Sequence, residues 1–246
     1  MGSMTGTQVP CSFIQTSNDA YLVINNLSHL YYITSGGLTL TAVGSPPTGP
    51  YCPGLVYLDN TVYIGIAGGT NSGRIYGSNI EDPTTWNALN YISATSEPDG
   101  LVAIAKQLNY LVAFGQWTTQ FFYDAGNATG SPLNVNLAAT LNIGCANGNS
   151  VASIEQTTLW VGTSLSEGRS VYLMDGLSPV KVSNRYIDKY LNGDAMTNVR
   201  SYCLKISGHS LYVLTLKDSN VTFVFDLDEK AWYQWSSQSG GTETVS

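Results

Sequence analysis

The side chains of this sequence best suited to chemistry are carboxylates that stand near the ends of expected strands. Enzymes that cleave glycosidic bonds use two such groups, one as a general acid and one as a nucleophile or base. The candidates are Asp59, Glu97, Asp99, Glu155 and Asp194. Asp99 stands just before an expected inner strand, where a carboxylate can instead accept hydrogen bonds from backbone N–H groups of the adjoining turn. We therefore interpret Asp99 as a structural residue and keep glycan cleavage as an alternative.

Other catalytic groups are scarce. The two histidines, His29 and His209, each stand beside a serine in a turn-like setting. Two histidines cannot make a three-histidine metal site, and no Gly-x-Ser-x-Gly motif occurs. The cysteines form no CxxC pair; they are Cys11, Cys52, Cys145 and Cys203. We predict free thiols in strands, no catalytic residue, no metal site and no cofactor.

The composition favours a structural protein. Charged residues make up 11% of the chain, against about 25% in an average protein. The net charge is −7, and no cluster of Lys and Arg occurs that would bind nucleic acid tightly. An acidic surface repels phosphate, so DNA could pass such a surface without binding to it. No apolar stretch approaches 18 residues, so we expect no contact with a membrane.

The elements that must position these residues recur along the chain. Short apolar runs follow polar turns at Tyr21–Ile24, Val62–Ile66, Leu108–Val112, Leu159–Val161 and Leu211–Leu214. Their spacing of about 40 to 50 residues, with two or three more strand candidates in each interval, is typical of propeller blades. We predict an all-β fold, a β-propeller of four-stranded antiparallel blades. About five blade units are visible, which form either a whole ring or part of a larger or open one.

Local signals add detail to this pattern. Asp82-Pro83 is expected to start a turn over which Trp86 packs, with the next strand at Ala88–Ser93. Asp175-Gly176 is a strong hairpin signal. One short helix is predicted at Asn184–Leu191, capped by Ser183 and stopped by Gly193.

The chain is expected to form one domain. Residues 1–8 are interpreted as a tag or disordered N-terminus, residues 9–236 as a single β-propeller, and residues 237–246 as a polar tail.

Short motifs spread over nearly the whole chain resemble one protein family. They are Ser78–Trp86, Glu97–Val102, Phe114-Gly115, Thr118–Phe122, Gly126, Ile143-Gly144, Ser170–Tyr172, Gly176, Lys181–Ser183, Arg185–Ile187, Leu211–Leu214, Val224–Asp226 and Trp232–Trp235. In this order they resemble the tail hub proteins of short-tailed bacteriophages, also described as packaged-DNA stabilisation, head-completion or nozzle proteins. Each motif is degenerate alone. Gln120 stands where relatives commonly carry an acid, so no charge is required there.

The resemblance implies a non-enzymatic virion protein that forms a homo-oligomeric ring, a hexamer, below the portal. Such a ring would close or extend the DNA exit channel, with DNA only as transported cargo, and dock portal, adaptor and other tail proteins. The protein would be assembled in the host cytoplasm and reside in the phage tail. The expected structural and blade-turn residues are Trp86, Asp99, Gly115, Gly176 and Trp235.

Two other functions stay open. Tyr and Trp beside Asn and Asp could form a sugar-stacking surface, so a carbohydrate-binding or glycan-cleaving propeller is the main alternative. Three carboxylates converging at one end of the axis would favour it, and an axis lined by apolar and amide groups would count against it. A propeller that serves as a general interaction scaffold is the other alternative.

Overall fold

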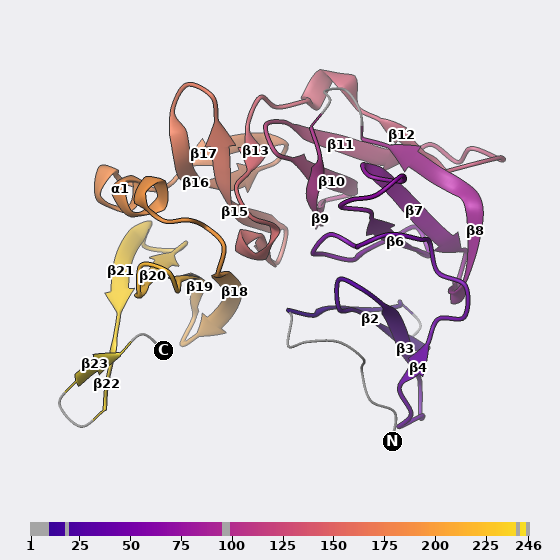
Figure 1. Ribbon diagram of the computed structural model, residues 1–246, viewed down its shortest axis with the longest axis horizontal. Helices are drawn as coiled ribbons and strands as arrows, with labels where there is room; N and C mark the ends of the chain where they lie inside the picture. Colours follow the sequence, from indigo (N-terminus) through magenta and orange to yellow (C-terminus); the bar gives the residue numbers. More distant parts are fainter. Residues whose placement is uncertain (1–9, 18–19, 95–98, 240–241, 245–246) are drawn as a thin grey trace.

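Five antiparallel sheets follow one another around a ring (Figure 1). The computed structural model describes residues 10–17, 20–94, 99–239 and 242–244. Within each sheet the strands lie side by side in chain order, so each blade comes from one stretch of sequence. This arrangement confirms the predicted five-bladed β-propeller.

The first three blades each have four strands. Blade 1 contains β1 (Ser12–Gln15), β2 (Tyr21–Asn25), β3 (Leu30–Thr34) and β4 (Thr41–Ala42). Blade 2 contains β5 (Val56–Leu58), β6 (Thr61–Gly65), β7 (Arg74–Asn79) and β8 (Asp82–Ser93). Blade 3 contains β9 (Leu101–Gln107), β10 (Tyr110–Gly115), β11 (Thr119–Asp124) and β12 (Leu133–Val135).

Blade 4 has two short strands at its inner position. They are β13 (Gly144–Cys145) and β14 (Ala152–Ile154), and both pair with the next strand. The rest of the blade is β15 (Thr157–Ser164), β16 (Gly168–Asp175) and β17 (Ser178–Lys181). Blade 5 contains β18 (Val199–Ile206), β19 (His209–Leu216), β20 (Val221–Asp226) and β21 (Ala231–Trp235).

The outer strand of blade 2 differs from the prediction. The turn lies at Ile80-Glu81, where Glu81 has φ +60°, and β8 already begins at Asp82. Pro83 is tolerated in this strand because β8 is the outermost strand of its sheet. An edge strand does not need every backbone N–H to donate a hydrogen bond to a neighbouring strand. Trp86 therefore lies in a strand, opposite Ser78, and not over a turn.

The helix differs from the prediction at both ends. Helix α1 (Arg185–Gly193) is capped by Asn184, whose side chain accepts from the N–H groups of Tyr186 and Ile187. Ser183 cannot serve as the cap because its hydroxyl donates to Asp188 and accepts from the N–H of Val171. Gly193 is the last helical residue and not a stop beyond it. At nine residues, α1 is too short to cross a bilayer, and no helix in the described chain could do so.

The predicted polar tail contains a small hairpin. Strands β22 (Ser237–Ser239) and β23 (Thr242–Thr244) pair with each other, and in Figure 1 they lie beyond the end of β21. They join no other sheet in the described chain. The expected tag at residues 1–8 lies outside the described residues.

Apolar side chains fill the spaces between consecutive blades. One buried cluster joins each pair from blades 1 and 2 through to blades 4 and 5. Trp160, between blades 3 and 4, is fully buried, with its ring centroid 5.2 Å from that of Phe114 and 5.7 Å from that of Tyr172. A fifth cluster, made of Leu211, Val213 and Val224, belongs to blade 5 alone.

The boundary between blade 5 and blade 1, called the seam below, is built differently. The paired row Tyr202, Val213, Val224 and Tyr233 lies on the face of blade 5 turned away from blade 4. Across the seam, blade 1 presents the row Phe13, Ile24 and Tyr31, on the face turned away from blade 2. In the described chain, no apolar cluster and no strand pairing joins these two blades.

Candidate functional site

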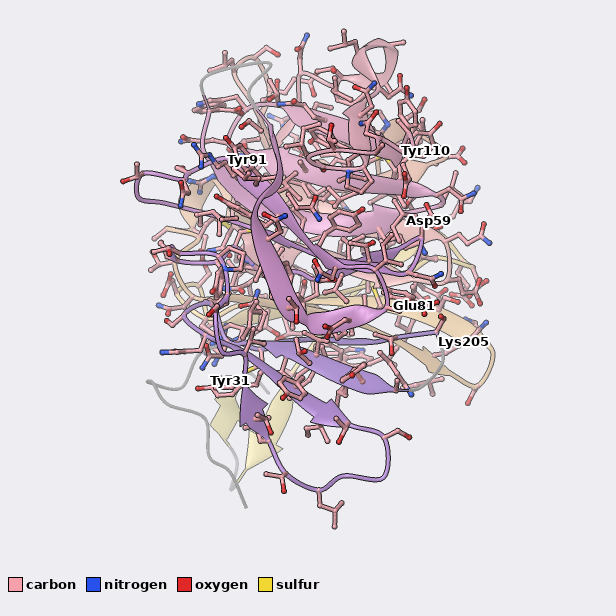
Figure 2. The ribbon with its side chains drawn as sticks, turned by 90° about the vertical axis from the view of Figure 1, so that its right-hand side faces the viewer. Tyr31, Asp59, Glu81, Tyr91, Tyr110 and Lys205 are labelled. Carbon is pink, nitrogen blue, oxygen red and sulfur yellow. The ribbon has the colours of Figure 1, made fainter. Side chains whose placement is uncertain are left out.

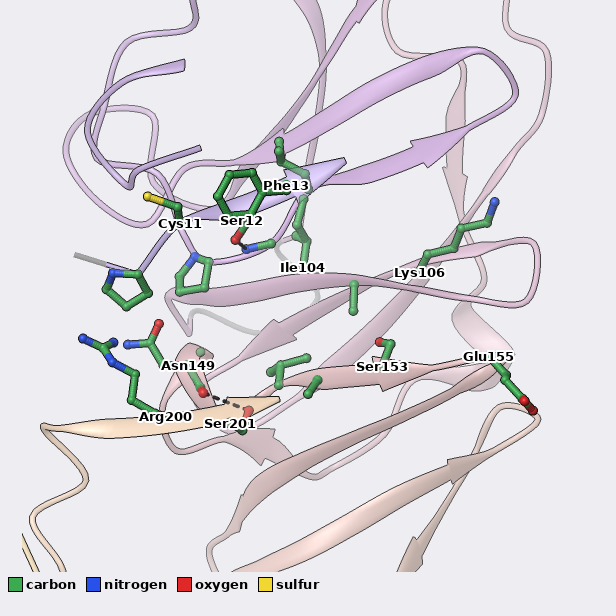
Figure 3. Close-up of a pocket in the computed structure, with 18 of the residues that line it drawn as sticks. Cys11, Ser12, Phe13, Ile104, Lys106, Asn149, Ser153, Glu155, Arg200 and Ser201 are labelled. Carbon is green, nitrogen blue, oxygen red and sulfur yellow. Dashed lines mark hydrogen bonds between the residues drawn. The ribbon is translucent and has the colours of Figure 1, made fainter. Parts of the chain in front are cut away.

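The innermost segments of all five blades surround an axial channel with a volume of about 880 Å³ (Figure 3). Its wall is about equally polar and apolar. The lining includes Phe13, Pro53, Leu55, Ile104, Ala105, Leu108, Asn109, Asn149, Val151, Ala152 and Gln156. Three charged side chains complete it: Lys106, Glu155 and Arg200. The channel is therefore a shared site, because every blade contributes to it through its innermost segment.

Of the carboxylates proposed as a catalytic pair, only Glu155 lines this channel among the described residues, and Glu97 lies outside the described residues. Glu155 is the one carboxylate of the described lining, and its Oε1 lies 2.6 Å from Nζ of Lys205. Asp59 lies in the β5–β6 turn at the same end of the ring as Lys205, but outside the lining (Figure 2). Asp194 is buried beyond α1, where it accepts from the N–H of Met196. A glycosidase pair needs two facing carboxylates, which the described lining does not offer.

Asp99 and Gly115 lie together. The Asp99 carboxylate accepts from the N–H groups of Trp117 and Thr118 at 2.7 and 2.8 Å, and from the Thr118 hydroxyl at 3.2 Å. A side chain at position 115 would collide with this carboxylate, which explains the glycine. Asp99 holds the turn that joins β10 to β11. This is not the turn next to Asp99 in the sequence, so the hydrogen-bond partners of Asp99 were not evident from the sequence. With its oxygens occupied in this way, Asp99 holds a turn in place.

The remaining expected structural residues lie in three separate blades. Trp86 of blade 2 packs against the core that blades 1 and 2 share, and its Nε1 donates to the carbonyl of Pro83. Gly176 has φ +60° in the β16–β17 turn, and its carbonyl accepts from Nε2 of Gln107 in blade 3. Trp235 ends β21 and is 37% exposed. None of the three lines the axial channel.

A second polar cluster, not predicted from the sequence, surrounds His209. Its Nδ1 lies 2.7 Å from Oδ2 of Asp226, and Glu229 is close enough that the three groups could surround a cation. Burial alone would raise the pKa of Asp226, but hydrogen bonds from the N–H groups of Glu229 and Asp228, and the His209 ring, lower it. Glu229 also accepts from the hydroxyl of Tyr233. The contact between His209 and Asp226 depends on the register of β19 and β20, which the local sequence pattern does not show. His29 is exposed in the β2–β3 turn.

The four thiols are free, as predicted. Only Cys145 and Cys203 lie in strands; Cys11 and Cys52 stand in segments that precede strands. Burial raises the pKa values of Cys52, Cys145 and Cys203 to about 12. A protonated thiol is a poor nucleophile, so these three residues serve as small apolar packing groups.

The sequence matches one family along almost its whole length. A family model described as "Bacteriophage P22 Gp10, beta-propeller" matches residues 1–244. The chain belongs to this family. The family is a phage structural and stabilisation family, which agrees with the predicted virion protein. No curated protein sequence matches the chain.

Solved structures resemble the chain in fold. One is a nidogen–laminin complex, with a TM-score of 0.53 and 11% identity, covering 89% of this chain and 76% of that one. Another is the dihydro-heme d1 dehydrogenase NirN in complex with DHE, with a TM-score of 0.55 and 11% identity, covering 93% of this chain and 49% of that one. Because identity is so low, these similarities concern the propeller fold alone.

Proposed function

We propose that this protein is a non-enzymatic structural subunit of a phage tail, a hub or nozzle component below the portal. It closes or extends the DNA exit channel and docks other tail proteins. The observation that carries the proposal is the family match over residues 1–244. The axial channel supports it, because its described lining has one carboxylate, already paired with a lysine, in place of a catalytic constellation.

The composition suits repeated protein contacts. Only 11% of residues are charged, and surfaces poor in charge lose less on desolvation when they are buried between subunits. Rigid blades presenting fixed loops are suited to a homo-oligomeric ring, for which we propose six subunits, since symmetric rings multiply each contact. Its partners would be portal, adaptor and other tail proteins.

DNA would pass through the ring of subunits and not along the propeller axis. The axial channel of one subunit has a volume of about 880 Å³, which is the size of a small-molecule pocket. The net charge of −7 would keep a subunit from holding the phosphate backbone as it passes.

Co-assembly with portal rings tests this proposal. The protein is mixed with portal rings of the same phage, and the complex is followed by sedimentation velocity and negative-stain electron microscopy. We expect a ring of this protein on one end of the portal, and portal rings of an unrelated phage serve as the control. Failure to co-assemble across a range of salt and protein concentrations would contradict the proposal.

A further inference from the structure

One part of the axial channel has the features of a binding site. The channel volume of about 880 Å³ falls within the range of ligand pockets, which are mostly apolar with a few placed polar groups. Phe13 lines it and is 59% exposed, so much of its ring is accessible. Such a ring gains most from an apolar group placed against it.

Phe13 and Arg200 lie where the channel meets the seam. Phe13 extends from β1 and Arg200 from β18, and Figure 3 shows them on opposite walls. Arg200 and Tyr202 stand two positions apart in β18, so their side chains lie on the same face of the strand. This is the face of blade 5 that is turned toward blade 1. Figure 3 also shows the amide of Asn149 beside the Arg200 guanidinium. The site thus combines an aromatic wall, a cation and an amide.

The charges of the lining are not balanced within the described chain. Arg200 makes no ion pair there, and Nζ of Lys106 is bonded to the carbonyl of Tyr57 at 3.1 Å and to no carboxylate. Glu155, the one acidic residue of the lining, is already paired with Lys205. The channel therefore offers positive charge in a protein whose net charge is −7. A guanidinium favours carboxylate or phosphate partners, which it can bind with two hydrogen bonds.

We propose that this site binds an extended peptide segment of a partner protein, with an acidic side chain held by Arg200 and an apolar side chain packed on Phe13. The inference rests on the proposed docking of tail proteins and specifies where one of them binds. A peptide is favoured over an oligonucleotide because the wall offers apolar and amide groups side by side, and the chain has no cluster of Lys and Arg for successive phosphates.

Selection from a library of displayed random heptapeptides tests the proposal. We expect enriched peptides to carry Asp or Glu next to Leu, Ile, Phe or Trp. Replacing that acid by its amide, or introducing Arg200→Gln, should each weaken binding of a synthetic enriched peptide about tenfold by fluorescence anisotropy. Phe13→Ala should weaken it by a similar factor, while the matched control Lys189→Gln, on α1 and outside the channel, should not change it.

Four outcomes would overturn the proposal. Three are the absence of any enriched peptide, enrichment without an acidic bias, and equal binding by Arg200→Gln. The fourth is tighter binding of a fluorescent oligothymidine than of any enriched peptide, which would favour a nucleic-acid site. Portal co-assembly of the Phe13→Ala/Arg200→Gln double variant separates the two proposals, because the docking inference can fail while the ring still forms on the portal. Circular dichroism of each variant checks that it is folded.

Discussion

The four boundaries that contain a shared apolar core, called the filled boundaries, and the seam are built from similar strands. They differ in how the side chains of these strands are packed. At the boundary of blades 4 and 5, Cys203 and Tyr212 of blade 5 pack into a shared core, and Trp232 donates to the carbonyl of Val182. On the opposite face of the same sheet, Tyr202 and Tyr233 remain 49% and 46% exposed. Val213 and Val224 of the same row are buried. This face is therefore covered at its centre and exposed at its two flanking tyrosines, whereas the opposite face completes a shared core.

This difference indicates where stability and binding reside. Four shared cores connect the five blades in succession, and among the described residues no strand pairing links blade 5 to blade 1. At the seam the central side chains Ile24, Tyr31, Val213 and Val224 are buried. The exposed aromatic groups of the two rows are Phe13, Tyr202 and Tyr233, and the seam adjoins the channel through Phe13 and Arg200. The four filled boundaries thus carry shared apolar cores, and the exposed surface at the fifth is limited to these aromatic groups and Arg200.

Thiol labelling gives the largest contrast between the two regions. Cys52, Cys145 and Cys203 each belong to or pack on a shared core, and burial raises their pKa values to about 12. At pH 8 only about one such thiol in ten thousand is ionised. Cys11 is half-buried and lines the channel, so iodoacetamide should modify it far faster than the other three.

Mass spectrometry of time points measures the labelling. Raising the pH toward 12 should speed the labelling of Cys52, Cys145 and the half-buried Cys203, because their thiolate fraction grows as the pH approaches the folded-state pKa. The variant Cys11→Ser should lack the fast phase. Two or more thiols reacting at the same fast rate would contradict the distinction between filled boundaries and channel.

Truncating a core side chain should show the next largest difference. Trp160→Ala empties the space between blades 3 and 4 and removes the hydrogen bond to the carbonyl of Gly144, so the free energy of unfolding should fall by about 3–5 kcal/mol. Tyr202→Ala, at the seam, should change it by no more than about 0.5 kcal/mol. Urea denaturation followed by circular dichroism measures both, and similar losses would show that the seam is packed like the other boundaries.

The sequence predicted best those features that depend on local alternation. The predicted run Leu211–Leu214 agrees with β19 (His209–Leu216) within two residues at each end, because an apolar run that follows a polar turn marks this strand clearly. The start of β8 was missed because Pro83 is a turn signal in general but is tolerated at a sheet edge.

Features that depend on contacts distant in sequence could not be predicted in this way. Asp99 could be recognised as a hydrogen-bond acceptor, but its partners at Trp117 and Thr118 depend on how β9 and β10 pair. The pairing of His209 with Asp226 likewise depends on the register of β19 and β20. Alternation shows that a strand has two apolar faces, but not whether a neighbouring blade covers each of them.

The contact between Asp99 and Gly115 gives the smallest and most specific test. Both residues fix the β10–β11 turn. The hydroxyl of Thr163 in blade 4 donates to the carbonyl of Gln116 in the same turn. The contact between Asp99 and Gly115 therefore belongs to the filled boundary of blades 3 and 4. Gly115→Ala should lower the free energy of unfolding by about 1–3 kcal/mol because the new methyl group meets the Asp99 carboxylate. Asp99→Ala should cost a similar amount, since two N–H groups lose their acceptor.

The double variant distinguishes this steric coupling from two independent losses. Once the carboxylate is removed, the methyl group at position 115 has no carboxylate to displace, so the double variant should be more stable than the sum of the single losses by at least about 0.5 kcal/mol. The control is Gly193→Ala, at the end of α1, where the added methyl group meets nothing; alanine there should be neutral or slightly stabilising. Strict additivity in urea denaturation would show that Asp99 and Gly115 act separately, and the specific packing assigned to this filled boundary would then be wrong.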